Sequence, residues 1–189
     1  MTQSDFPSPA PFTAEEEERI SKELASRLDV KDILQRNTGG GMAPYVEGHV
    51  LVRTANSIFG FNKWTNRIIE LTTDYCDASN ERYSAGCSCI TRITLSDGTF
   101  HEDVGYGSCE NVKTRAMALE KSKKQATTDA FKRCCRLFGD KLGNCCYDKE
   151  FTNTLPKPAG GAPQGGGYQA GGQGGRGGYQ PRGGSNSRF

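Results

Sequence analysis

Positively charged side chains gather in one stretch of this 189-residue chain, although its net charge is only +2. Residues 111–141 hold nine Lys or Arg and three acidic residues, whereas residues 1–25 hold six acidic residues and two basic ones. A charge run is most often a solvated helix face, but here the acidic residues are too few to neutralise it. The phosphates of a polyanion would do so, which makes nucleic acid the leading partner. The basic positions behind this argument are Lys113, Arg115, Lys121, Lys123, Lys124, Lys132, Arg133 and Arg136.

Two Arg-Gly-Gly elements lie near the C-terminus, beginning at Arg176 and Arg182. Glycine occupies 13 of the 34 positions after Leu155, so residues 156–189 cannot bury enough apolar surface to fold and should be disordered. In nucleic-acid-binding tails, flexible arginines meet phosphates and tyrosines stack on bases. A plain flexible tail is the alternative, and the composition does not decide between the two.

The run His101-Glu102-Asp103 holds side chains that could bind a metal ion or act as acid and base in a nuclease. Successive side chains of a β-strand point to opposite faces, however, so Glu102 should point away from His101 and Asp103. The other histidine, His49, is expected to be structural. No Gly-x-x-x-x-Gly-Lys-Ser/Thr loop is present to cradle nucleotide phosphates. We therefore expect no metal, no cofactor and no enzymatic activity.

The eight cysteines form one Cys-x-Cys and two adjacent pairs rather than the paired Cys-x-x-Cys spacing of zinc sites. No apolar signal segment precedes them, which argues against a secreted disulfide scaffold. We expect mainly reduced, buried thiols at positions 76, 87, 89, 109, 134, 135, 145 and 146.

Local patterns predict the elements that carry the basic stretch. A capping box at Thr13-Ala14-Glu15-Glu16 predicts the start of one helix, and apolar residues at helical spacing from Val46 predict a second that ends at Gly60. Between Trp64 and about Tyr106, β-branched and aromatic residues separated by turn signals predict three strands in a meander.

A long basic helix is predicted to follow at residues 110–138. Two faces of this helix are expected. One is an apolar face of Val112, Ala116, Leu119, Ala126, Ala130, Cys134 and Leu137, and the other is a polar stripe of Lys124, Thr128, Lys132 and Arg136.

The predicted fold class is therefore α+β, with a three-stranded antiparallel meander followed by a long basic helix and flanked by further helices. We expect a disordered lead-in at residues 1–12 and a single folded domain at residues 13–155. No stretch approaches the ~18 consecutive apolar residues of a membrane span. We expect a soluble protein of the cytosol or nucleus.

Several motifs resemble the annealing domain of the Rad52 family over residues 13–155, in the expected order. They are Tyr45-Val46-Glu47-Gly48, Phe59-Gly60-Phe61-Asn62-Lys63-Trp64, the run from Asp97 to Gly107, the run from Glu120 to Ala130, Lys132-Arg133, Arg136-Leu137-Phe138-Gly139, Leu142-Gly143-Asn144 and Tyr147-Asp148-Lys149.

This resemblance implies a closed homo-oligomeric ring with a basic groove around its outside. Single-stranded DNA would lie there with its backbone inward, and complementary strands would be paired without ATP during double-strand break repair in the nucleus. The inner groove contacts implied are Arg36, Tyr45, Lys132, Arg133 and Arg136. An outer site for a second strand or a duplex is implied at Arg82 and Lys113, with auxiliary basic residues at Lys121, Lys124, Arg176 and Arg182.

Two segments depart from the family pattern. The loop at Met42-Ala43-Pro44 is shorter and less basic than usual, and a Gly-rich tail replaces the C-terminal half that recruits the RecA-like recombinase and replication protein A in animals and fungi. Binding of those two partners is therefore not assumed. The alternative function is general binding of single-stranded DNA or RNA, mainly through the tail.

Overall fold

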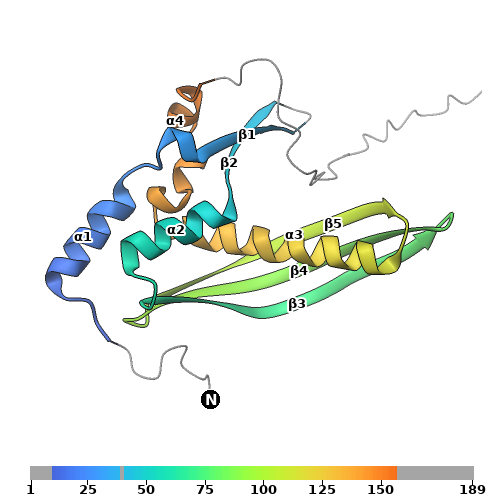
Figure 1. Ribbon diagram of the computed structural model, residues 1–189, viewed down its shortest axis with the longest axis horizontal. Helices are drawn as coiled ribbons and strands as arrows, with labels where there is room; N and C mark the ends of the chain where they lie inside the picture. Colours follow the sequence, from blue (N-terminus) through green and yellow to red (C-terminus); the bar gives the residue numbers. More distant parts are fainter. Residues whose placement is uncertain (1–9, 39–40, 157–189) are drawn as a thin grey trace, which may run out of the picture.

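The computed structural model describes residues 10–38 and 41–156. A three-stranded antiparallel sheet in the order β3-β4-β5 lies against one long helix, and a separate hairpin and smaller helices gather near one end of that helix (Figure 1). The strands are β1 (Ile33–Asn37), β2 (Met42–Val46), β3 (Trp64–Ser79), β4 (Arg82–Leu95) and β5 (Phe100–Val112). The helices are α1 (Ala14–Ala25), α2 (Gly48–Phe59), α3 (Arg115–Arg136) and α4 (Lys149–Asn153), with 3₁₀ turns η1 (Val30–Asp32), η2 (Asp140–Leu142) and η3 (Asn144–Tyr147).

The predicted α+β class and the antiparallel meander are confirmed. On β4, Ala85, Cys87 and Cys89 are fully buried on the face that meets α3. On β5, Gly105 and Gly107 allow an unusually close approach of the helix. A Cβ at either glycine would overlap α3 backbone, at Ala130 and Ala126 for the first and at Ser122 for the second.

The buried face of α3 differs from the predicted one. The residues that pack on the sheet are small and recur at every fourth position: Ala118, Ser122, Ala126, Ala130 and Cys134. Ala116 and Leu137 are exposed instead, and Val112 belongs to β5. The strand continues to Val112 because β4 offers pairing partners over its whole length, so α3 begins only at Arg115, capped by the Thr114 hydroxyl.

The capping box of α1 is confirmed. Thr13 Oγ1 accepts from the Glu16 amide at 3.2 Å, and the Glu16 carboxylate accepts from the Thr13 amide at 2.9 Å. Ile20 is buried on this helix, whereas Leu28 is buried beyond its end. The helix predicted from Val46 begins instead at Gly48, because Val46 closes the β1–β2 hairpin, which the sequence patterns did not predict.

All eight cysteines are free. Burial is confirmed for Cys87, Cys89, Cys134, Cys135 and Cys145, and burial raises the pKa of the Cys134 thiol to about 11. Cys76, Cys109 and Cys146 are only half-buried. Within residues 10–38 and 41–156, no helix combines the length and the apolar character needed to cross a bilayer.

Candidate nucleic-acid interface

A single groove of about 580 Å³ brings together all five residues of the predicted inner site. Its walls come from the β1–β2 hairpin, from β5, from the C-terminal half of α3 and from the segment containing η2 and η3 (Figure 1). We call this feature the basic groove, because its lining includes Arg36, Tyr45, Lys132, Arg133 and Arg136. Residues from three separate stretches of the chain thus meet at one place.

One wall of the basic groove is organised around the ring of Tyr45. The Lys132 ammonium lies 5.5 Å from the ring centroid, and the Arg36 guanidinium lies 5.7 Å from it. Pairing of Leu34 with Tyr45 and of Arg36 with Ala43 in the hairpin sets this geometry. Desolvation by burial, together with the positive charge of Arg36, lowers the pKa of Lys132. The ring therefore has two mutually repelling cations close to it.

Two arginines that line the basic groove share one carboxylate partner. Asp103 accepts from Arg133 Nε at 3.2 Å and forms a 3.5 Å ion pair with Arg136 Nη2. The Asp103 side chain is only 15% exposed, while those of Arg133 and Arg136 are 39% and 22% exposed. The guanidinium of Arg136 also lies 4.5 Å over the ring of Tyr147. Asp103 thus holds two arginines in place without cancelling their combined charge.

The His101-Glu102-Asp103 run has the alternation that the sequence predicted. Glu102 faces away from α3 and pairs with Arg92 at 2.6 Å. His101 packs edge-on against Phe138 at a centroid distance of 4.6 Å, and Asp103 binds the two arginines. Among the described residues, no group of three or more His, Cys, Asp or Glu is placed to hold a metal ion.

Two contributors to the basic groove were missed by sequence reasoning. Tyr147 lies in η3, where no periodic pattern singles it out, and Asp103 had been considered only as part of a metal cluster. A second acid, Asp129, lines the groove and accepts from the Tyr106 amide at 3.2 Å. The signal available in the sequence was the position of Asp129 three residues before Lys132, which places both on one side of a helix.

The predicted outer site lies at the other end of α3. Arg82, the first residue of β4, donates to the carbonyl of Asn111 at 3.4 Å, and Lys113 is exposed in the short connection after β5. The helix predicted from residue 110 would include Lys113, but Lys113 precedes α3 because β5 extends to Val112. At 1.5 Å of rise per residue, the 17 positions from Arg115, the first residue of α3, to Lys132 span roughly 26 Å.

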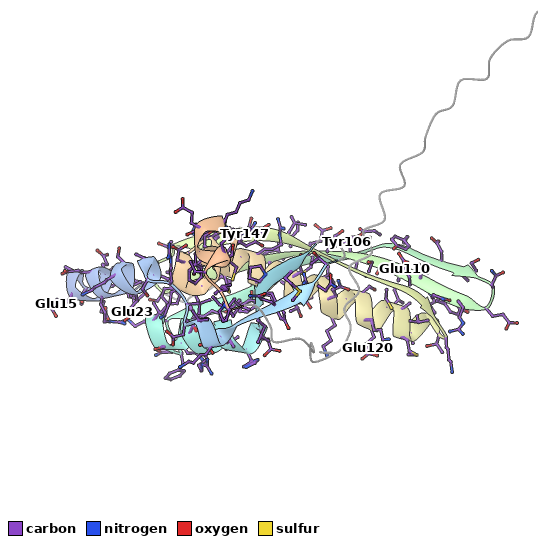
Figure 2. The ribbon with its side chains drawn as sticks, turned by 90° about the horizontal axis from the view of Figure 1, so that it is seen from above. Glu15, Glu23, Tyr106, Glu110, Glu120 and Tyr147 are labelled. Atoms are coloured by element: carbon purple, nitrogen blue, oxygen red, sulfur yellow. The ribbon has the colours of Figure 1, made fainter. Side chains whose placement is uncertain are left out.

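The remaining basic residues are distributed differently. Lys121 and Lys124 are exposed on α3 between the two predicted sites, and neither lines the basic groove. Figure 2 shows the same separation along the long axis, with Tyr147 toward the α1 end and Glu120 of α3 toward the other. Arg176 and Arg182 lie outside the described residues.

Comparison with known proteins decides the family. The Rad52/22 family double-strand break repair protein description matches residues 16–159. The chain belongs to the Rad52/22 family. Rad52-family relatives include the DNA repair and recombination protein rti1 of Schizosaccharomyces pombe, 45% identical over 150 residues, which are 78% of this chain and 40% of that relative.

Two further Rad52-family relatives carry the name DNA repair and recombination protein RAD52. The protein of Eremothecium gossypii is 44% identical over 139 residues, covering 73% of this chain and 32% of the relative. The protein of Saccharomyces cerevisiae is 39% identical over 142 residues, covering 72% of this chain and 30% of the relative. The chain therefore matches less than half the length of each of these Rad52-family proteins.

Proposed function

We propose that this Rad52-family chain binds single-stranded DNA in the basic groove and anneals complementary strands without ATP, in recombinational repair of double-strand breaks. One observation carries the proposal: Arg36, Tyr45, Lys132, Arg133 and Arg136, which the family resemblance implies as one set, line one groove. The relatives' names as DNA repair and recombination proteins are consistent with it. We place the activity in the nucleus and in residues 13–155, and we assign the chain no enzymatic role.

The charges of the groove suit a nucleic-acid backbone. Cationic side chains neutralise phosphates in a way that does not depend on sequence, and affinity then falls steeply as salt rises. A strand held by its phosphates keeps its base edges available to a complementary strand. Annealing of this kind requires that the bases be held out to a second strand, and no covalent bond is made or broken. A groove lined by cations in fixed positions suits this task.

Assembly into a closed ring is part of the proposal. The outer edges of β3 and β5 have no pairing partner within the described sheet, and such edges invite pairing with another chain. On the face of β5 away from α3, Phe100 and Val104 are 51% and 52% exposed. A neighbouring subunit would cover these apolar groups, and repetition of one interface closes a ring.

We assign Arg82 and Lys113 to an outer site that receives a second strand or a duplex. Their separation from the basic groove along α3 allows both sites to be occupied at once. Partners of the proposal are therefore DNA and further copies of the chain. Because the relatives are much longer, we do not extend it to replication protein A or a RecA-like recombinase.

The test is annealing of complementary oligonucleotides by the full chain with and without ATP, together with its mass at working concentration. Equal annealing rates in both conditions and a multisubunit mass are expected. A monomer contradicts the ring, and no annealing contradicts the function. The alternative, nucleic-acid binding mainly through the tail, requires that Arg176→Gln with Arg182→Gln abolish binding, whereas the basic groove requires that most affinity persist.

A further inference from the structure

Tyr147 presents an exposed aromatic ring at the rim of the basic groove. The residue is 64% exposed although it lines the groove. It occupies the last position of η3, and the preceding Gly143 has a φ of 105°, a left-handed conformation that favours glycine and turns the chain into this short helix. The backbone thus places the ring where the basic groove meets solvent.

The environment of Tyr147 differs from that of Tyr45, another tyrosine that lines the groove. Tyr45 is half-buried and has cations close to its ring from both Arg36 and Lys132. Tyr147 has one cation, Arg136, at 4.5 Å from its ring centroid. Since most of Tyr147 is exposed, Arg136 can cover only one face of the ring. The other face is available to a planar ligand.

The position of Arg136 links this ring to a phosphate contact. Its Nη2 pairs with Asp103 at 3.5 Å, so the guanidinium is held at both its edge and its face. A nucleotide whose phosphate lies near Arg136 would carry its base toward the rim, where Tyr147 lies. Stacking on an aromatic ring tolerates every base, because each base has a π face.

We propose that Tyr147 is a base-stacking position, which holds one base per subunit at the rim of the basic groove. Tyr45, by contrast, is a positioning residue whose ring contacts both Arg36 and Lys132. This inference rests on the proposed binding of single-stranded DNA. It goes further by assigning the groove a contact to bases in addition to its contacts to phosphates.

The experiment compares an oligothymidylate with an abasic strand of the same length, so that the two differ in bases but not in phosphates. Binding of each strand to the full chain is measured by fluorescence anisotropy over a salt series. Tyr147→Leu should weaken binding of the oligothymidylate by about 10-fold, leave binding of the abasic strand within about 2-fold, and leave the salt slope unchanged. Tyr147→Phe should retain wild-type binding of both strands.

A second variant tests stacking directly. Tyr147→Trp should bind normally, because the position is exposed, and its added fluorescence should be quenched by the oligothymidylate but not by the abasic strand. Phe61→Leu is the matched control, since Phe61 is an 81% exposed aromatic residue that does not line the groove, and it should bind both strands as the wild type does.

The outcomes separate the two claims. Equal losses on both strands for Tyr147→Leu, with thermal unfolding unchanged, would overturn the stacking role and leave Tyr147 as a support for Arg136. Unquenched tryptophan fluorescence would overturn it as well. A wild-type chain that binds neither strand contradicts the proposed function itself, whereas binding of both strands with equal affinity contradicts only the contact to bases.

Discussion

Asp103 on β5 and Arg133 on α3, a residue that lines the basic groove, join the sheet to the helix through a 3.2 Å hydrogen bond. The same carboxylate pairs with Arg136, so one acidic side chain fixes the direction of two cations. Arg133 and Arg136 are three positions apart and lie on adjacent parts of the helix surface. Their mutual repulsion is offset by Asp103, which allows both to face a polyanion.

Replacing Asp103 with Asn should weaken DNA binding even though it increases the net charge of the chain by one. The arginines would stay charged but lose their shared carboxylate, of which asparagine keeps only one neutral oxygen, and ordering them on the DNA should cost about 2- to 10-fold in affinity. The free energy of unfolding should fall by about 1–2 kcal/mol. Anisotropy and urea unfolding measure the two effects. Tighter binding by the variant would mean that charge alone, and not the position of the arginines, governs affinity.

The adjacent carboxylate supplies the control for that experiment. Glu102→Gln removes the partner of Arg92 on the opposite face of the sheet. It changes the net charge by the same amount as Asp103→Asn but leaves Arg133 and Arg136 untouched, so its affinity for single-stranded DNA should match that of the wild type.

Substitutions at the two ends of α3 should separate first-strand binding from annealing. Lys132→Ala and Arg133→Ala should each weaken both activities and reduce the log–log salt slope by about 0.7, the value for one phosphate contact on a single strand. Arg82→Ala and Lys113→Ala should retain much of the first-strand affinity and mainly slow pairing. The measurements are anisotropy over a salt series and annealing by fluorescence quenching. Equal losses of first-strand affinity in all four variants would contradict the division into two sites.

DNA binding should weaken as the pH rises toward the lowered pKa of Lys132. Burial and the nearby Arg36 lower this pKa in the free protein, so the ammonium loses its proton at a lower pH than an ordinary lysine does. Only the protonated form neutralises a phosphate, so affinity should begin to fall at a lower pH than it would for a groove with an ordinary lysine. Lys132→Arg should flatten this profile, because arginine stays protonated. A decline of the same size in the arginine variant would assign the pH dependence to another group.

Gly105→Ala should separate α3 from the sheet. The added Cβ would overlap the backbone of Ala130 and Ala126, and backbone atoms cannot rotate away as a side chain can. We expect a loss of about 3 kcal/mol or more in the free energy of unfolding, measured by urea denaturation. Gly48→Ala is the control, because nothing lies within 4 Å of its added Cβ. A stable Gly105→Ala variant would show that the helix can shift along the sheet without loss.

The sequence by itself determined those structural features that depend only on residues close to one another along the chain. The Thr13 capping box, the alternation along β4 and the basic character of α3 each follow from spacings of two to four residues. The family motifs also identified Arg36, Tyr45, Lys132, Arg133 and Arg136 as a set, although they said nothing of the distances between them.

The tertiary structure decided what depends on contacts between distant parts of the chain. Three features follow from how the hairpin, the sheet and η3 pack around α3. They are the contacts of Tyr45 with Arg36 and Lys132, the pairing of Asp103 with arginines 30 and 33 positions later, and the exposure of Tyr147. The buried face of α3 was decided in the same way. Its small residues are buried because Gly105 and Gly107 let the backbones of β5 and α3 come close together. The space between a helix and a sheet depends on both elements, so the sequence of either one alone does not specify which side chains fit there.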